Sequence, residues 1–507
     1  MKSYFLGIDN GGTVSKAAIF DETGLQIAQA SSSVRMLTPK AGHTERDMDE
    51  LWHVTASVIR NVVAKSGIPA EQIKGVACTG HGKGLYLWGK DGKPCGNGII
   101  STDTRAWEYP VKWAKDGTAD KVFAKTFQSI LACQPVSLLN WMMDHEPKRL
   151  EHVQWIFEVK DYIRFRLTGT AAAEITDYSG SNLLNCATKA FDKDLLDDFN
   201  LGHLSHALPP LVKSSQMCGT ISKQAAADTG LAEGTPVAGG MFDIDACAIA
   251  MDITNEDHVA VIAGTWSINE YISKRPVLDR SVQMNSLYCM DDYYLIEESS
   301  PTSASNYAWF VDTFLAEERA EAKRLGRHPY AYCDGLAGHI PPDGQRIVFL
   351  PYLYGSNYNA QAKASLLGMD SHHTRAHMIR AVLEGIAFGH KVHLNRLLAN
   401  RESTASIRLA GGVTASDLWT RIFCDVFELP VQTIDTSELG ALGCAMAAAV
   451  ASGTYKDLPE AAAHMVRVGE TRQPDLANSA IYRDKFALYE SVGAALEPTW
   501  KNFNEKT

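Results

Sequence analysis

The chain contains one local pattern twice, once at its N-terminus and once just past its middle. Residues 4–8 predict a short apolar strand, residues 9–13 (Asp-Asn-Gly-Gly-Thr) a turn, and residues 14–20 a returning strand. Residues 258–263 predict a second apolar strand, which is again followed by a glycine and a threonine, Gly264-Thr265. The sequence therefore predicts two matched hairpins with glycine-containing tips, and a chain whose two halves share one design.

The size of the chain also favours two domains. A chain of 507 residues, 45% of them hydrophobic, can bury more core than one domain normally organises. The second pattern begins soon after residues 244–256, which places the boundary between the halves there. We expect an N-terminal domain over residues 1–247 and a C-terminal domain over residues 248–507, with a movable cleft between them.

Helices and further strands are predicted between the hairpins. Residues 48–65 form an amphipathic helix that Gly67 ends, and residues 376–396 form a long helix with Thr374 as its N-cap. Shorter helices are expected over 416–427 and 440–452. Four predicted strands lead into polar or glycine-rich segments of the kind that bind ligands in open α/β sheets, at residues 79–84, 101–105, 239–243 and 411–412.

Composition and charge exclude several classes of partner. The formal net charge is −11 with neutral histidines, and no long run of like charges suggests a nucleic-acid-binding arm. The ten cysteines are scattered without zinc-site spacing, as expected for reduced, buried thiols. We expect no signal peptide, because the apolar run near the N-terminus is too short for one, and the longest apolar stretch, residues 441–451, is well short of the roughly 20 needed to span a bilayer. We expect a cytoplasmic protein with no membrane partner.

Both predicted hairpin tips carry groups that suit phosphate binding. Backbone N–H groups approach phosphate oxygens most closely where no Cβ intervenes. Gly11, Gly12 and Thr13 offer one such tip, and Gly264 and Thr265 offer a second from the other half. One pair of this kind is more often a tight turn without a ligand, but two in matched positions favour phosphate binding.

Two aspartates stand at predicted strand ends beside glycines. Asp9 could reach a phosphate-bound metal ion, or it could form an Asx-turn with the following amides. Asp243 stands at a strand-to-helix junction, where the helix N-terminus is expected to lower its pKa and keep it ionised as a base. The alternative for Asp243 is a helix N-cap, and Asp245 is a rival for the base. Local inference thus reaches a two-domain nucleotide-binding enzyme.

Longer stretches of the chain resemble a known family. In order and spacing they resemble the signature set of the FGGY carbohydrate kinases. The stretches are Gly7-Ile8-Asp9-Asn10-Gly11-Gly12-Thr13, Gly239-Gly240-Met241-Phe242-Asp243, Ala263-Gly264-Thr265-Trp266 and Leu409-Ala410-Gly411-Gly412-Val413-Thr414-Ala415-Ser416-Asp417-Leu418-Trp419. Residues 160–169 and 383–388 are also similar to family stretches, so the resemblance covers nearly the whole chain.

The resemblance implies the actin/hexokinase-like α/β fold, in which two ribonuclease-H-like domains close over ATP and a sugar. It implies ATP and Mg2+ as cofactors, with Asp243 as the catalytic base and Asp9 as the Mg2+-associated carboxylate. Sugar and Mg2+ would be bound by the N-terminal domain and ATP by the C-terminal domain. The implied nucleotide-binding residues are Gly11, Gly12, Thr13, Gly264, Thr265, Ser305, Gly411, Gly412 and Ser416.

On the sugar side, Asp103 and Arg105 match an Asp-x-Arg that meets sugar hydroxyls in pentulose kinases of the family. On pattern alone they would be a surface ion pair. Family members that act on D-xylulose carry a segment similar to Gln-Met-His-Gly at the position where this chain has His81-Gly82-Lys83-Gly84. A D-xylulose pocket is therefore not expected. His81 and Lys83 are the candidate sugar contacts at this segment, although a histidine near a strand end is more often structural.

Five segments resemble the L-xylulose/3-keto-L-gulonate kinase branch of the family, namely residues 41–48, 82–85, 134–139, 300–303 and 350–357. This likeness implies phosphorylation of L-xylulose to its 5-phosphate, or of 3-keto-L-gulonate to its 6-phosphate. Lys83 could pair with the carboxylate of the sugar acid, or it could bond hydroxyls or face solvent.

Two other functions stay open. The acceptor could be ribulose, D-xylulose, xylitol or glycerol, because one hydroxyl is distinguished by pocket geometry. The scaffold could also serve a non-catalytic ATP-binding regulator, which would need no base at Asp243. Family members are commonly dimers, and a homodimer is therefore an open expectation for this chain.

Overall fold

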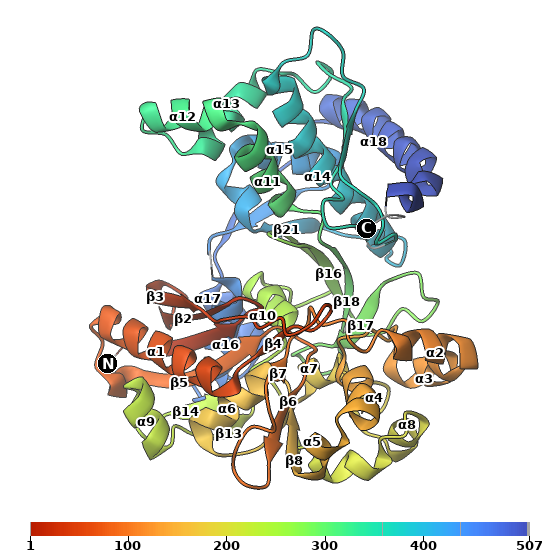
Figure 1. Ribbon diagram of the computed structural model, residues 1–507. Helices are drawn as coiled ribbons and strands as arrows, with labels where there is room; N and C mark the ends of the chain where they lie inside the picture. The colour runs from red at the N-terminus through yellow and green to blue at the C-terminus, as the bar shows by residue number, and fades with distance from the viewer. Residues whose placement is uncertain (1, 357, 437, 504–507) are drawn as a thin grey trace.

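Two mixed β-sheets form the centres of two lobes (Figure 1). The computed structural model describes residues 2–356, 358–436 and 438–503. Asn357, the last residue of the branch-like segment 350–357, lies outside the described residues.

The N-terminal sheet begins with the predicted hairpin. β1 and β2 pair antiparallel, β3 continues the antiparallel part, and β5 and β14 extend the sheet parallel to β1. The strand order is β13-β14-β5-β1-β2-β3. The bounds are β1 Tyr4–Asn10, β2 Val14–Asp21, β3 Gln26–Ser33, β5 Ile73–Gly80, β13 Met217–Thr220 and β14 Pro236–Ala238.

The C-terminal sheet repeats this plan. β15, β16 and β18 are antiparallel neighbours, while β21 and β22 extend the sheet parallel to β15. The strand order is β17-β18-β16-β15-β21-β22-β23. The bounds are β15 His258–Ala263, β16 Ser267–Ser273, β17 Met284–Leu287, β18 Tyr294–Ser300, β21 Ser406–Ala410, β22 Val431–Ile434 and β23 Val468–Arg472. The repeated sequence pattern is therefore a repeated sheet topology, while the boundary at residues 247/248 stays a prediction.

Local signals fix the ends of the predicted helices. Helix α1 (Met48–Ser66) begins after Asp47, whose carboxylate accepts the N–H of Glu50, and ends at Gly67 in the left-handed region, with φ of 66°. Helix α14 (Arg375–Leu398) begins after Thr374. These boundaries agree with the sequence-based expectations to within two residues.

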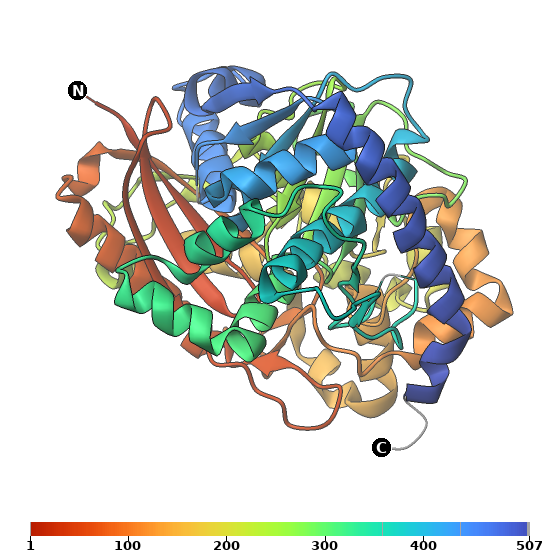
Figure 2. The ribbon, with the colours of Figure 1, turned by 90° about the horizontal axis from the view of Figure 1, so that it is seen from above.

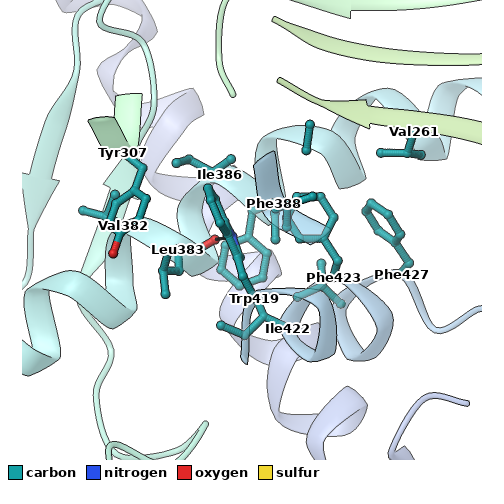
Figure 3. Close-up of a cluster of buried hydrophobic side chains, with 14 of the residues drawn as sticks. Val261, Tyr307, Val382, Leu383, Ile386, Phe388, Trp419, Ile422, Phe423 and Phe427 are labelled. Carbon is teal, nitrogen blue, oxygen red and sulfur yellow. Dashed lines mark hydrogen bonds between the residues drawn. The ribbon is translucent and has the colours of Figure 1, made fainter. Parts of the chain in front are cut away.

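Helices α14 and α15 (Asp417–Phe427) pack against each other and against the C-terminal sheet (Figure 3). Trp419 of α15 lies beside Ile386 and Leu383 of α14, and its indole N–H donates to the Leu383 carbonyl at 3.0 Å. Aromatic side chains of α15 fill the space toward Val261 of β15. This core supports the turn that follows β15.

Helix α16 (Leu439–Ala451) crosses from the C-terminal half of the sequence onto the N-terminal sheet, where it packs on β1 and β5 beside α10 (Asp243–Ala250). Glycines allow the close approach. A Cβ added at Gly7 would lie 1.8 Å from the Ala441 carbonyl oxygen, and one at Gly443 would lie 2.2 Å from that of Ala246. In Figure 1 α16 and α17 (Leu458–Met465) accordingly lie in the lower lobe.

The remaining helices lie in the lower lobe of Figure 1 (α2–α9) or in its upper lobe (α11–α13 and α18). In Figure 2 the C-terminal helix α18 (dark blue) crosses the side of the upper lobe, and the α12 region projects above the red N-terminal strands. Their bounds are α2 Glu108–Asp116, α3 Thr118–Thr126, α4 Pro135–His145, α5 Pro147–Glu151, α6 Val159–Thr168, α7 Ile175–Ser179, α8 Lys193–Asp198, α9 Lys223–Thr229, α11 Ala304–Phe314, α12 Ala316–Arg324, α13 Pro329–Gly338 and α18 Leu476–Leu496.

Short strands complete the two lobes. They are β4 Glu45–Arg46, β6 Tyr86–Gly89, β7 Gly98–Ile99, β8 Val153–Phe157, β9 Ala173–Glu174, β10 Leu184–Asn185, β11 Ala190–Phe191, β12 Leu211–Val212, β19 Val348–Leu350 and β20 Ser365–Leu367. All ten cysteines are free thiols. Among the described residues, no helix combines the length and the hydrophobicity needed to cross a membrane.

Candidate functional site

The first hairpin tip, between β1 and β2, is hydrogen-bonded through its carbonyl groups to a buried arginine. Arg46 is fully buried, and its guanidinium donates to the carbonyl oxygens of Gly11 and Gly12. The Thr13 carbonyl accepts the N–H of Val34 at 3.0 Å. A Cβ at Gly12 would meet nothing within 4 Å, so this part of the tip faces open space.

The second tip, between β15 and β16, is tied to the start of α11. The Gly264 carbonyl accepts the N–H of Ala304 at 2.9 Å, and the Ser305 hydroxyl donates to the Thr265 carbonyl at 2.9 Å. Ser305 therefore fixes this turn from a helix that lies forty residues further along the chain.

A cavity of about 650 Å³ brings together five of the predicted nucleotide-binding residues: Gly264, Thr265, Ser305, Gly412 and Ser416. The sixth from this half, Gly411, has φ of 95°, and a Cβ there would lie 2.5 Å from the Ala263 carbonyl oxygen. Only glycine allows the turn after β21 to pack so closely on β15. Ser416 begins α15, its hydroxyl accepting the N–H of Trp419 at 3.0 Å.

The opposite wall of this cavity was not predicted. It contains Tyr307, Tyr330, Asp334 and Trp419. The rings of Tyr307 and Tyr330 lie 5.4 Å apart, and burial raises the pKa of the Asp334 carboxyl, whose Oδ1 has no partner among the described residues. Flat apolar walls with a few polar atoms suit a small-molecule site. The sequence signal was weak, because aromatic residues on helices usually belong to a core.

Asp9 ends β1 beside the first tip. Its carboxylate accepts no hydrogen bond in the part of the chain that the structure describes, so the Asx-turn alternative is not observed. Burial raises its pKa to about 6; the charge of Lys16 opposes this shift and that of Glu438 adds to it. A Cβ at Gly440 of α16 would lie 3.0 Å from Asp9 Oδ2, which leaves the carboxylate facing a helix with no side chain at that point.

Asp243 is the first residue of α10, and Phe242 is the N-cap. The expectation that the helix N-terminus lowers the pKa of Asp243 is wrong. Burial raises this pKa well above its usual value, and the negative charge of Asp9 raises it further. Desolvation and a like charge outweigh the partial charge of a helix end.

Two features hold the segment that leads to Asp243. Gly240 has φ of 78°, and a Cβ there would lie 2.0 Å from the Cys78 carbonyl oxygen of β5. The Phe242 N–H donates to the Thr176 hydroxyl at 2.9 Å, and Thr176 donates to Glu174 at 2.7 Å. The backbone before Asp243 is therefore held against β5 at Gly240 and against α7 at Phe242.

Glu174 belongs to a fully buried ionic network. Lys160 lies 3.0 Å from Asp161, 3.3 Å from Glu174 and 3.4 Å from Asp177, and Arg164 lies 2.8 Å from Asp161. Lys160, Asp161 and Arg164 fall in the family-like stretch 160–169. These residues support the segment before α10, and none of them lines the cavity described above.

The rival base Asp245 is fully buried. Its Oδ1 accepts the N–H of Cys289 at 2.8 Å, and burial raises its pKa well above the usual value. This carboxyl group is thus tied to the chain segment after β17, and Asp243 is kept as the candidate base.

A second cavity, of about 370 Å³, lies between the halves and is lined by Lys83, Gln128, Ser129, Arg280, Glu297 and Arg396, among others. Lys83 is a non-glycine residue with φ of 65°, and its ammonium lies 5.8 Å from the centre of the Phe242 ring, next to Asp243. The charge of Lys83 lowers the pKa of Asp243 and that of Glu297 raises it, so both lie near the candidate base. The alternative that Lys83 simply faces solvent is not observed.

Other predicted sugar contacts are buried. His81 Nε2 lies 2.9 Å from the Tyr86 hydroxyl, and burial lowers the pKa of His81 to about 3, so the ring is neutral. Arg105 lies 2.8 Å from both Asp103 and Glu45. The expectation of a surface ion pair from pattern alone is wrong, since Asp103 and Arg105 are 1% and 6% exposed.

Comparison with known proteins shows the family to which the chain belongs. The family models for the N-terminal and C-terminal domains of the FGGY family of carbohydrate kinases match residues 4–250 and 259–452. The chain is 35% identical to the L-xylulose/3-keto-L-gulonate kinase of Escherichia coli (strain K12), over all of both chains. It is 33% identical to a probable L-xylulose kinase of Pasteurella multocida (strain Pm70), covering 98% of this chain and 99% of the relative.

Solved structures give the same fold. A gluconate kinase from Lactobacillus acidophilus superposes with a TM-score of 0.89 at 24% identity, covering 99% of this chain and 100% of that one. A Plasmodium falciparum glycerol kinase with ADP superposes with a TM-score of 0.85 at 19% identity, covering 98% of each chain. The fold is the actin/hexokinase-like fold of these sugar kinases. On sequence and structure together, the chain belongs to the FGGY family of carbohydrate kinases.

Proposed function

We propose that this carbohydrate kinase uses ATP to phosphorylate L-xylulose at O5, or 3-keto-L-gulonate at O6. The observation that carries the proposal is the position of Asp243. Asp243 is the first residue of α10 and directly follows Phe242, whose ring lies 5.8 Å from the Lys83 ammonium in the smaller cavity. The charges of Asp9, Lys83 and Glu297 also shift the pKa of Asp243. A base placed there serves an acceptor in one cavity and a nucleotide whose phosphates reach the tips.

In the proposed reaction, the larger cavity holds the adenosine part of ATP, and backbone N–H groups of the two tips, with the Thr13 and Thr265 segments, hold the phosphates. Asp243 accepts the proton of the acceptor hydroxyl as the hydroxyl oxygen bonds to the γ-phosphorus. The bond from the γ-phosphorus to the bridging oxygen breaks, and ADP leaves. Closure of the lobes would exclude water from this step.

Asp9 fits the role of a carboxylate beside a magnesium ion. It is partly buried and has no hydrogen-bond partner within the described residues, and its raised pKa of about 6 reflects a site that favours a compensating cation. Mg2+ bound to ATP would neutralise phosphate charge there. Without the cation, Asp9 and Asp243 repel each other.

The observed contacts support the four proposed sugar-binding residues to different degrees. Arg105 Nη1 is buried and unpaired among the described residues, whereas both oxygens of Asp103 are engaged by Arg105 and by the Thr44 N–H. The guanidinium is therefore the part of this pair that can donate to a sugar hydroxyl. His81 supports the pocket through Tyr86. Lys83 has no anionic partner in the described chain, which supports pairing with the carboxylate of a sugar acid.

A coupled assay of ADP formation tests the proposal. The acceptors to compare are L-xylulose, 3-keto-L-gulonate, D-xylulose, D- and L-ribulose, xylitol and glycerol. We expect an L-configured ketose to give the highest kcat/KM. Equal or higher kcat/KM for D-xylulose, a ribulose or a polyol would contradict the proposed acceptor while leaving the family assignment intact.

Cytoplasmic location and a homodimer complete the proposal. The reduced state of all ten cysteines suits a reducing compartment, and dimers are common in the family. Sedimentation at micromolar concentration would test the dimer, for which a single monomer-sized species is the contrary result.

A further inference from the structure

Two glutamates lie opposite each other in the C-terminal sheet, on the face toward α10. β16 and β18 are antiparallel, and their register pairs Glu270 directly with Glu297. The neighbouring Glu298 alternates to the other face of the sheet. It also lines the smaller cavity, but its carboxylate is already paired, 3.0 Å from His393 of α14 and 3.4 Å from Arg396. Side chains alternate along a strand, so Glu297 and Glu270 point toward the N-terminal half.

Glu297 is a polar group without a protein partner in the cavity beside the candidate base. It is 6% exposed and lines the smaller cavity with Lys83. Within the described residues its carboxylate has no hydrogen bond and no salt bridge. An isolated buried acceptor group costs free energy unless a ligand or water satisfies it.

Glu270 is the buried neighbour of Glu297 on the adjacent strand. It is fully buried, neither of its oxygens has a partner among the described residues, and burial raises its pKa well above the usual value, with Glu297, Asp245 and Asp243 adding to the shift. Two charged glutamates opposite each other would repel. Of the two glutamates, Glu297 is the one that lines the cavity, where it can act as an acceptor group.

We propose that Glu297 accepts a hydrogen bond from a hydroxyl of the acceptor sugar and is a specificity-determining residue. This inference rests on the proposed function. Lys83 enters the cavity from the segment after β5, and Glu297 enters it from β18. Lys83 can thus donate and Glu297 can accept a hydrogen bond from opposite halves of the chain, which suits a polyhydroxy ketone that contacts both halves.

The test is the kinetics of Glu297→Gln with the preferred ketose and with its singly deoxygenated analogues. A charge-assisted hydrogen bond lost from the complex predicts a fall of about 10- to 100-fold in kcat/KM for the ketose, with KM for ATP unchanged within about twofold. For the one analogue that lacks the contacted hydroxyl, wild type and variant are expected to have similar kcat/KM.

Two further variants control for charge and folding. Asp291→Asn removes a carboxylate from the turn between β17 and β18, where Asp291 is exposed and pairs with Lys213, and should leave both KM values unchanged. Glu297→Asp keeps the charge and should retain more activity than Glu297→Gln. Melting temperatures within a few degrees of wild type would show that the variants fold.

Three results would overturn the inference. The first is an unchanged kcat/KM in Glu297→Gln, and the second is an equal loss with the ketose and every deoxy analogue. The third is a rise in KM for MgATP alone, which would assign Glu297 to the nucleotide. If wild type phosphorylates no ketose, the proposed function itself fails, a result separable from these. If Glu297→Gln does not fold, Glu297→Asp with the analogue series decides the same question.

Discussion

At the scale of single residues, the candidate base works among other carboxyl groups. Burial, Asp9, Asp177 and Glu297 all raise the pKa of Asp243, and Lys83 lowers it. A base with a raised pKa accepts a proton more readily. As the pH falls, however, it becomes protonated and inactive at a higher pH than an ordinary carboxylate would. The surroundings of Asp243 therefore set both its strength and its working range.

Removal of the Lys83 charge should move the pH profile. Lys83 lowers the pKa of Asp243, so Lys83→Gln should raise that pKa and shift the acidic limb of kcat/KM for L-xylulose to higher pH. The exposed Lys213→Gln serves as control and should leave the limb in place. A shift to lower pH would contradict the electrostatic account of the base.

Replacement of Glu270 by glutamine should stabilise the protein at high pH. The pKa of Glu270 is raised above 4.5 in the folded chain, so above that pH the unfolded chain has lost a proton that the folded chain keeps, and stability falls as pH rises. Glutamine resembles the protonated carboxyl without this penalty. The free energy of unfolding from urea titration should be higher for Glu270→Gln than for wild type at pH 8, with a smaller difference at pH 5. A variant less stable at pH 8 would show that Glu270 is ionised and paired.

At the scale of helices and strands, local signals accounted for much of the fold. Apolar strands next to Gly-Gly and Gly-Thr predicted both hairpins, and Gly67 and Thr374 marked helix ends correctly because capping depends on a few neighbouring residues. The position of α16 on the N-terminal sheet was not predictable in this way. It depends on the fit of Gly7 and Gly443 to distant backbone atoms, which no single segment encodes.

In the candidate site, too, features set by local sequence were predictable and features set by tertiary contacts were not. Residues in turns, such as Gly264 and Gly412, were predicted as nucleotide-binding residues with the help of the family resemblance, and the structure brings them to one cavity. The wrong pKa direction for Asp243 came from weighing only the adjacent helix end, whereas burial and Asp9 act through the tertiary structure. Glu297 was missed because a glutamate in a strand gives no signal of its own.

The contact between α10 and α16 should tolerate no side chain at Gly443. A methyl group there would lie 2.2 Å from the Ala246 carbonyl oxygen, and Gly443→Ala should destabilise the protein by about 1–3 kcal/mol or more. Gly335→Ala is the matched control, because a Cβ in that exposed part of α13 meets nothing within 4 Å and should stabilise by about 0.5–1 kcal/mol. Urea titration measures both. A Gly443→Ala variant as stable as wild type would contradict the close packing.

At the scale of the whole molecule, the function depends on how the two halves meet. The larger cavity belongs to the C-terminal half, Asp9 and Asp243 to the N-terminal half, and the smaller cavity takes residues from both. Near its rim, Arg280 forms an ion pair with Asp120 of α3 at 2.6 Å. Both groups are exposed, so the pair contributes little energy and can break as the lobes move.

The account rests most directly on Asp243 as the base that takes the proton of the sugar hydroxyl. The decisive measurement is the acceptor-dependent rate of ADP formation by Asp243→Asn, beside Asp245→Asn as a control on the same helix. We predict that Asp243→Asn lowers kcat for the preferred ketose by at least about 100-fold while still binding ATP, and that Asp245→Asn retains most of the activity. Substantial turnover in Asp243→Asn, or its loss in Asp245→Asn alone, would contradict the assignment of the base.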